Sequence, residues 1–151
     1  DAVATTRHDP YARFVFQVDL GAGDPGSADA GFEEVGPIAG CIDVIEYRAG
    51  NDKVNTARKM PGLHRVHDVT LRRGLIGTTT LFDWFRAGTL GQADRRTVTI
   101  RLMNEDRSDV VFTWRLVRAW PVKYVVPSLN ASSSEVAIEE LVLACEGIEI
   151  E

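Results

Sequence analysis

One stretch decides the fold class: Thr-Val-Thr-Ile-Arg-Leu-Met at residues 97–103, Asn-Glu-Asp-Arg-Ser-Asp at 104–109, and Val-Val-Phe-Thr-Trp-Arg-Leu at 110–116. Apolar and polar residues alternate in the first run, and the alternation resumes in the third. A period of two places apolar side chains on one face of a strand and polar side chains on the other. A turn-forming cluster between two such runs is typical of a hairpin. The stretch therefore predicts two antiparallel strands with one dry face and one wet face.

The same alternation marks strands on both sides of this stretch. It groups apolar residues in three more segments: Phe14, Phe16, Val18 and Leu20; Ile42 and Val44; Val69 and Leu71. A chain of 151 residues is long enough for one domain with a buried core. We therefore predict a mainly β fold, a single-domain β-sandwich or barrel over residues 1–151 that carries one α-helix.

The expected helix covers about residues 79–87. Leu81, Trp84 and Phe85 fall on one helical face at i, i+3 and i+4. Thr80 and Asp83 have the spacing of a capping box, and Gly88 is placed to end the helix.

The C-terminal segment fits two structures. Ile138, Leu141 and Cys145 form a helical stripe. Read as a strand, the segment places Leu141 and Cys145 on one face, and the adjacent Glu139 and Glu140 mark a bulge. Periodicity alone does not choose between these two structures.

Motifs that carry chemistry are weak. Residues 21–26 have the glycine spacing of a dinucleotide-binding turn, but further turn-forming residues follow where that turn needs a helix. His64, His67 and Asp68 lie close in sequence, but they lack a third histidine nearby and favour a surface or an interface over a metal site. No serine lies in a nucleophile elbow. We therefore expect no enzyme, and no catalytic, metal or cofactor-binding residue.

Five further residues are of types that usually pack inside proteins. Cys41 and Cys145 each lie in an apolar segment, which predicts two reduced and buried thiols. The sequence does not decide whether these two cysteines form a disulfide. Trp84, Trp114 and Trp120 are most simply core residues.

Charge is arranged in blocks. The formal net charge is −5, but it comes from −7 over residues 1–46, +5 over 47–74, −1 over 75–94, +4 over 95–123 and −6 over 124–151. Such blocks fit either a mixed surface or complementary faces of two subunits. The negative total argues against nucleic acid as the main partner. The chain also lacks the run of ~20 apolar residues that a membrane helix needs.

The segment Arg48–Gly62 reads as a polar loop of 15 residues with four basic residues and one acidic residue. Loops longer than about 12–15 residues without structure of their own are uncommon and usually functional or disordered. A stand-alone barrel has no use for a long cationic arm, so this loop favours a contact with another subunit.

Three segments occur in this order: Tyr-Arg-Ala-Gly-Asn-Asp-Lys-Val-Asn-Thr-Ala-Arg-Lys-Met-Pro-Gly-Leu-His at 47–64, Asp-Val-Thr-Leu-Arg-Arg-Gly at 68–74 and Leu-Phe-Asp-Trp-Phe at 81–85. Together they resemble the phage tail tube protein family, and most of all the inner-tube subunits of extracellular contractile injection systems. The ending Val-Ala-Ile-Glu-Glu-Leu-Val-Leu-Ala-Cys-Glu-Gly-Ile-Glu at 136–149 is also similar, and the likeness begins at the Arg13 strand.

The resemblance implies a C-terminal strand, and six-membered rings that stack into a hollow tube inside a contractile sheath. The implied partners are further copies of the chain, the sheath protein, baseplate or tube-initiator proteins and effector cargo in the lumen, with no membrane insertion by the subunit and no nucleic acid. The particle would be assembled in the bacterial cytoplasm, and would be released or act from there. The implied role involves no chemistry.

The resemblance also places the long loop at 48–62 against a neighbouring ring or subunit. The candidate interface residues are Arg48, Asn51, Asp52, Lys53, Asn55, Arg58, Lys59, Met60, Arg72 and Arg73. Two other hypotheses stay open. One is a baseplate or tube-end member of the same family, whose rings do not extend. The other is a stand-alone small β-barrel that binds a ligand.

Overall fold

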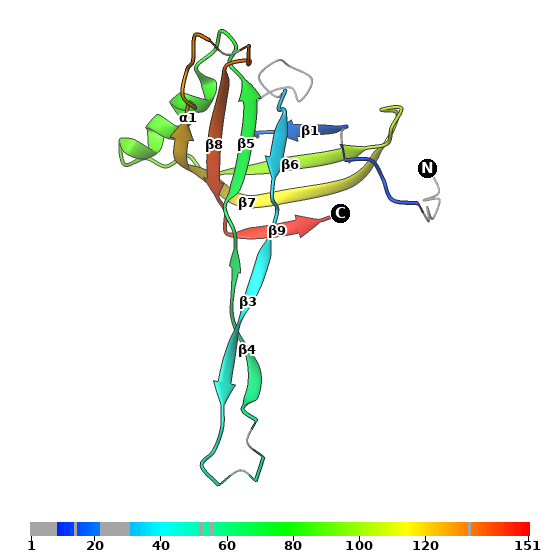
Figure 1. The fold of residues 1–151 in the computed structure, drawn as a ribbon, viewed down its shortest axis with the longest axis vertical. Coiled ribbons are helices and arrows are strands. Elements are labelled where there is room, and N and C mark those ends of the chain that lie inside the picture. The colour runs from blue at the N-terminus through cyan, green and yellow to red at the C-terminus, as the bar shows by residue number, and fades with distance from the viewer. Residues whose placement is uncertain (1–8, 14, 22–30, 52, 55, 133) are drawn as a thin grey trace.

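Strands make up about half of the structure, a computed structural model that describes residues 9–13, 15–21, 31–51, 53–54, 56–132 and 134–151 (Figure 1). The elements, in chain order, are β1 (Phe16–Asp19), β2 (Glu34–Gly36), β3 (Gly40–Tyr47), β4 (Arg58–Val66), β5 (Val69–Gly74), α1 (Thr80–Thr89), β6 (Arg96–Met103), β7 (Val110–Val125), β8 (Ile138–Ala144) and β9 (Gly147–Ile150). The prediction of a mainly β fold with one helix is confirmed for the described residues.

Strand β7 connects two groups of strands into one bent sheet. Its first part pairs with β6 and β9, and its last part pairs with β8, in the order β1-β6-β7-β8-β5-β2. Arg118 lies where β7 changes partners and has a φ of 52°, in the left-handed region. The two groups, β1-β6-β7-β9 and β7-β8-β5-β2, run in crossing directions over one another (Figure 1). We refer to both groups and α1 together as the body.

The core fills the space between the two groups of strands and α1. Its buried side chains are Val18, Val69, Leu71, Leu81, Trp84, Val98, Ile100, Leu116, Ala119, Leu141 and Leu143. The apolar faces predicted from the alternation of residues 16–20, 69–71 and 97–116 supply most of them. The predicted hairpin turn at 104–109 is confirmed, since the Asn104 N–H donates to the Asp109 carbonyl at 3.0 Å.

The helix differs from its prediction at both ends. Thr79, not Thr80, is the N-cap residue, and its hydroxyl donates to the Asp83 carboxylate at 2.9 Å rather than accepting from a backbone N–H. Gly88 does not end α1, which continues to Thr89. The predicted apolar face is confirmed because Leu81 and Trp84 are buried and Phe85 packs against the core.

The C-terminal segment is a strand, as the family resemblance implied. The predicted bulge at Glu139 and Glu140 is wrong, because β8 keeps an unbroken register with β5 across both residues. The register shift lies in β7, between Pro121 and Lys123. Glu139 therefore shares the inward face of β8 with Leu141.

The prediction of two buried cysteines is wrong for Cys41. Its side chain is exposed on β3, because that strand contributes nothing to the core. Cys145 is half-buried, and burial raises the pKa of its thiol. Both thiols are free. Of the predicted core tryptophans, Trp84 is buried, whereas Trp114 and Trp120 are only half-buried.

Strands β3 and β4 form a separate two-stranded sheet, called here the β3–β4 arm, which projects from the body (Figure 1). The expected loop at 48–62 is therefore too long. Residues 58–62 belong to β4 and pair with β3, so that Tyr47 lies opposite Arg58 and Ile45 opposite Met60. Apolar and polar side chains do not alternate regularly in β4, so periodicity did not predict this strand. The hydrogen bonds between two strands join backbone N–H and C=O groups, and every residue except proline carries both. The glycine-rich motif at 21–26 lies outside the described residues apart from Gly21.

Candidate assembly surface

The β3–β4 arm has no core of its own. Six large apolar or aromatic side chains in its two strands are exposed: Ile42, Val44, Ile45, Tyr47, Met60 and Leu63. A two-stranded hairpin without further packing is marginally stable in water. Exposed apolar side chains at this density usually mark a surface that binds another molecule. The arm therefore has the properties of a segment that is covered by a partner.

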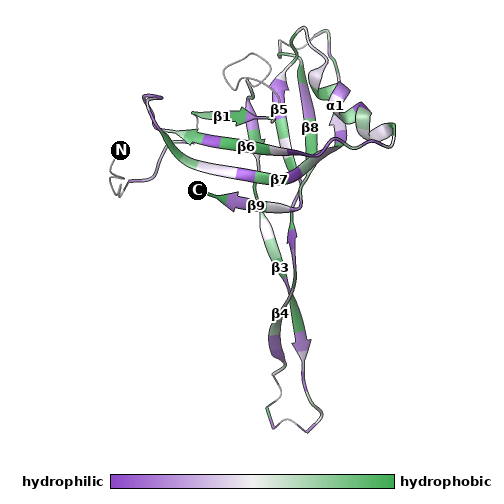
Figure 2. Ribbon diagram, turned by 180° about the vertical axis from the view of Figure 1, so that it is seen from behind, coloured by the Kyte–Doolittle hydropathy of each residue, from purple (hydrophilic) through white to green (hydrophobic). Residues whose placement is uncertain are grey.

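Both faces of the arm carry apolar side chains. Ile45 lies opposite Met60 on one face. Val44 lies opposite Pro61 on the other face, since neighbouring strand residues point to opposite sides. The colouring by hydropathy shows apolar and polar residues mixed along both strands (Figure 2). A hairpin lying flat on its own subunit would need only one apolar face, so this arrangement fits a hairpin that enters between surfaces.

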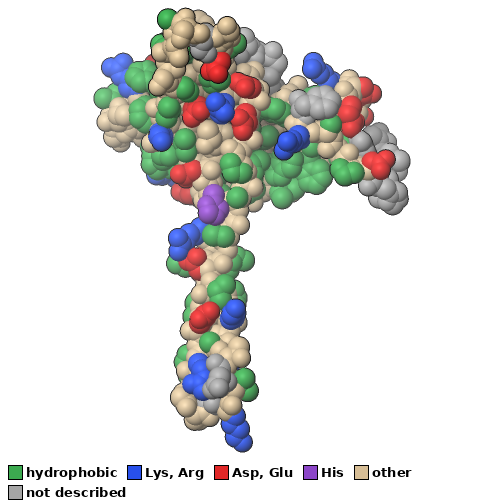
Figure 3. All heavy atoms as spheres, in the orientation of Figure 1, with side chains coloured by type: hydrophobic (Ala, Val, Ile, Leu, Met, Phe, Trp, Pro, Cys, Tyr) green, Lys and Arg blue, Asp and Glu red, His purple; other side chains and the backbone are tan. Residues whose placement is uncertain are grey.

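The outer part of the arm is basic. Lys53, Arg58 and Lys59 are exposed there, and basic side chains gather at the tip in Figure 3. The Arg48 Nε donates to the Val54 carbonyl at 3.1 Å, which bridges the connection between the strands. Nearer the body, Arg65 donates to Asp43 at 2.7 Å, and this hydrogen bond and charge raise the pKa of Arg65.

The structure brings together most of the candidate interface residues. Arg58, Lys59 and Met60 lie on the arm, in β4, and Arg48, Asn51 and Lys53 lie in the connection that joins its two strands. Asp52 and Asn55 lie outside the described residues. Arg72 lies on β5 in the body, where its guanidinium contacts Glu34 at 3.2 Å and Glu140 at 3.0 Å.

Arg73 is not a surface residue, so its prediction as an interface residue is wrong. It is 1% exposed because β5 alternates, and Arg73 shares the inward face with Val69 and Leu71. Its Nε donates to Glu139 at 2.6 Å, and Nη2 donates to the Thr80 hydroxyl at 3.2 Å.

Tyr124 completes this buried cluster. Its hydroxyl donates to the second oxygen of Glu139 at 2.6 Å. Burial, together with that hydrogen bond, raises the pKa of Tyr124 to about 12. The cluster joins β5, β7, β8 and α1 and has a structural role within the subunit.

Sequence reasoning missed the apolar part of the arm. Ile42 and Val44 indicated a strand, but alternation did not show that this strand would lie outside the core. Leu63, at the register shift of the arm, is 80% exposed. The available signal was the apolar Val44-Ile45 pair, which places one apolar side chain on each face.

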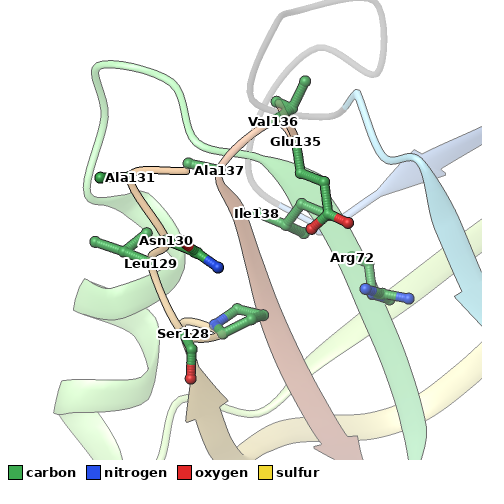
Figure 4. A pocket seen from close by; sticks show the side chains of 10 residues that line it. Arg72, Ser128, Leu129, Asn130, Ala131, Glu135, Val136, Ala137 and Ile138 are labelled. Carbon is green, nitrogen blue, oxygen red and sulfur yellow. The ribbon is translucent and has the colours of Figure 1, made fainter. Parts of the chain in front are cut away.

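A surface hollow of about 490 Å³ lies between β5 and the segments 127–131 and 135–138 (Figure 4). The Arg72 guanidinium at its edge is already paired with two carboxylates. Within the described part of the chain, no three His, Cys, Asp or Glu side chains are grouped to hold a metal ion, and His64 and His67 are both exposed. Nor is any described helix long and apolar enough to cross a bilayer.

Comparison with known proteins identifies the family. The family model described as "T4-like virus tail tube protein gp19" matches residues 12–149. The chain belongs to this tail tube family. A search of curated protein sequences found no significant match.

Solved structures agree with the tail tube assignment. A chain in the PVC sheath/tube terminator, in the extended state, has a TM-score of 0.83 and 30% identity, covering 97% of this chain and 99% of its own. A chain in the extended PVC sheath–tube complex has a TM-score of 0.79 and 30% identity, covering 95% and 93%. A chain in the anti-feeding prophage tube-terminating cap has a TM-score of 0.82 and 27% identity, covering 100% and 95%.

More distant solved structures share the fold alone. Hcp1 from Flavobacterium johnsoniae has a TM-score of 0.56 at 14% identity, covering 91% of this chain and 94% of its own. The protein is thus a structural protein of the tube type found in contractile injection systems.

Proposed function

We propose that the protein is a self-assembling subunit of the inner tube of a contractile injection system. Its copies form six-membered rings, and the rings stack into a hollow conduit that carries effector cargo inside a contractile sheath. The subunit performs no catalysis. Its partners are further copies of itself, the sheath protein and the baseplate proteins that start the tube.

The observation that carries this proposal is the β3–β4 arm. It projects from the body, exposes apolar side chains on both faces and ends in basic residues. Such an arm needs a partner that offers a different surface. A contact between two different surfaces of one subunit is heterologous, and it continues from copy to copy into a ring or a filament.

The outward face of β1-β6-β7-β9 suits the wall of the conduit. Cross-strand register aligns Gln17, Arg101 and Thr113 in one row on this face, and all three are partly exposed. Its charges are paired locally, because Arg115 contacts Glu151, and Arg101 lies 4.0 Å from Asp19. A wet wall whose charges neutralise one another gives passing cargo few strong binding sites.

A tube-end subunit is the second candidate. Chains from a tube-terminating cap and from a sheath/tube terminator are as similar to this chain as a chain from the sheath–tube complex. The two roles differ in how far a ring can be extended, since an end subunit stops growth.

Electron microscopy of the purified full chain tests the proposal. A main tube subunit forms tubes of many stacked rings at high concentration, whereas a tube-end subunit forms single rings or short stacks. Sedimentation velocity gives the same distinction in solution, because tubes have no upper size limit. Monomers over a wide range of concentration would contradict both roles and favour a stand-alone barrel.

A further inference from the structure

Two charged side chains interrupt the apolar faces of β5 and β8. On β5, Arg73 is the last of three inward-facing residues, and the other two are Val69 and Leu71. On β8, Glu139 is the first of three inward-facing residues, and two leucines follow it. Arg73 and Glu139 lie directly opposite one another, and their side chains are 1% and 3% exposed. Apolar residues that pack well in place of a buried ion pair often give equal or higher stability, so stability alone does not explain this pair.

The apolar residues of β8 do not determine its register with β5. Side chains alternate between the two faces of a strand, so a shift by two residues leaves each side chain on the same face. After such a shift, Leu141, Leu143 and Cys145 would take the places of Glu139, Leu141 and Leu143. Two of the incoming side chains are leucines, and the third is already half-buried. The connection from β7 to β8, residues 126–137, is long enough to absorb the shift at a small cost in entropy.

The ion pair distinguishes the observed register from the shifted one. In the observed register, the Arg73 Nε donates to Glu139 at 2.6 Å. A shift by two residues would place Leu141 opposite Arg73 and Leu75 opposite Glu139. Each charge would then lose its counter-charge. Since a buried charge without its counter-charge is strongly unfavourable, the shifted register is disfavoured far more than apolar packing alone would achieve.

The same cluster connects β8 to β7 and β5 to α1. Tyr124 on β7 donates to the second oxygen of Glu139 at 2.6 Å. The Arg73 Nη2 donates to the hydroxyl of Thr80, at the start of α1, at 3.2 Å. The ladder between β7 and β8 contains a register shift just before Tyr124, and the hydrogen bond from Tyr124 holds the strands in one alignment after that shift.

We propose that the cluster of Arg73, Glu139 and Tyr124 selects the register of β8 between β5 and β7. A single buried polar residue has this role in some coiled coils, where it specifies the register at a cost in stability. The register of β8 also determines where β9 begins, because β9 follows β8 closely and pairs with β7 in the other group of strands. The cluster therefore controls how the two groups of strands are joined, and this role goes beyond the proposed tube function.

Disulfide trapping measures the register directly. In a chain whose Cys41 and Cys145 are replaced by alanine, Thr70→Cys with Val142→Cys places two thiols opposite each other in the observed register. Thr70→Cys with Ala144→Cys places two thiols opposite each other only after the shift by two residues. Opposite residues lie within the range of a disulfide, whereas diagonal neighbours are too far apart. The effective concentration of each thiol pair, measured in a glutathione buffer on the unassembled chain, reports the population of its register.

The ratio of the two effective concentrations should depend on the cluster. With the cluster intact, the observed register should be favoured at least about a hundredfold. Arg73→Met with Glu139→Leu makes these inward positions apolar and should lower the ratio at least about tenfold. The matched control is Leu71→Met with Leu141→Met, which changes the neighbouring opposite pair at similar volume and should leave the ratio unchanged.

A second variant keeps the test decisive if the apolar variant does not fold. Arg73→Leu with Leu75→Arg moves the cation by two residues. Because residue 75 pairs with Ala137 in the observed register, the moved cation lies opposite Glu139 only after the shift. This variant should raise the effective concentration of the shifted thiol pair at least about tenfold.

The outcomes decide the proposal without reference to tubes. A ratio in the apolar variant that equals the ratio of the intact cluster would show that apolar packing sets the register, and the proposal would be wrong. A moved cation that leaves the shifted thiol pair as rare as before would overturn it equally. Because both measurements use the unassembled chain, a failure of the tube function would not affect either result.

Discussion

Strands β3 and β5 show the same sequence pattern and the opposite environment. Val69 and Leu71 in β5 are separated by one polar residue, and both are 0% exposed. Ile42 and Val44 in β3 have the same spacing, and both are 61% exposed. Alternation therefore establishes that a segment is a strand, but it does not establish which surface covers the apolar face.

The comparison extends to whole regions. The body packs its strands around a shared core and holds a buried ion pair, whereas the described part of the β3–β4 arm contributes no residue to that core. The free energy of folding must come almost entirely from the body. The arm is then free to carry a sequence that is optimised for a partner surface, and the following predictions test that division.

The largest expected effect is in the buried cluster. Arg73→Leu leaves the Glu139 carboxylate buried without its guanidinium, although Tyr124 still donates to it, and breaking a buried ion pair costs about 3–5 kcal/mol. Urea unfolding of the unassembled chain measures the loss. Arg73→Met with Glu139→Leu removes both charges and should lose clearly less. Wild-type stability of Arg73→Leu would show that the pair does not stabilise the body.

A matched pair of leucines compares body and arm directly. Leu141→Ala removes a fully buried side chain from β8 and should cost about 2–5 kcal/mol. Leu63→Ala removes a side chain that is 80% exposed on β4, and it should change the free energy of unfolding by no more than about 0.5 kcal/mol. Urea unfolding below the concentration of assembly measures both. Equal losses would mean that the arm packs on its own body in solution.

The body was largely predictable, because apolar and polar residues alternate along its strands and other segments of the same chain pack against their apolar faces. The strand at 97–103, the turn at 104–109 and the apolar face of α1 follow from local pattern alone. Arg73 was not predictable in this way, since a buried arginine requires a carboxylate that lies 66 residues later in the chain. The inward direction of Glu139 likewise depends on the register with β5.

The arm was predictable only in part. Its basic residues and its likeness to a tail tube family indicated an interface, but its second strand was hidden in an irregular polar sequence. The apolar groove between β1, β6 and β7 on one side and residues 33–38 on the other was not predictable, because it arises where one group of strands extends past the other. Neither feature is a property of a single segment, and a pattern within one segment cannot reveal it.

A smaller effect is expected from the tyrosine of the buried cluster. The pKa of Tyr124 is raised to about 12 by burial and by Glu139, whereas an unfolded tyrosine titrates near pH 10. Since the unfolded chain loses this proton first, the stabilisation is complete below pH 10 and is lost as the pH rises through about 12.

Tyr124→Phe removes this alkaline titration. It should cost about 1–2 kcal/mol at neutral pH, because Glu139 loses one hydrogen-bond donor. The difference from the wild type should then shrink between pH 10 and about 12 in urea unfolding curves. A constant difference across that range would show that the Tyr124 hydroxyl is not held by Glu139.

The smallest expected effect is a difference in reactivity between two thiols, one on the arm and one in the body. Measuring both thiols shows how each region changes during assembly. Cys41 is exposed on the arm, whereas Cys145 is half-buried in the body with a pKa raised by burial and by Asp68. Since the thiolate is the nucleophile, Cys41 of the unassembled chain should react about tenfold faster with iodoacetamide at pH 7.5. Cys41→Ser and Cys145→Ser assign the two rates.

Assembly should slow the reaction of Cys41 and leave that of Cys145 nearly unchanged, because the arm becomes covered and the core of the body does not change. If Cys41 reacts equally fast in tubes, the base of the arm stays uncovered, and the contact with the second copy is confined to its outer half.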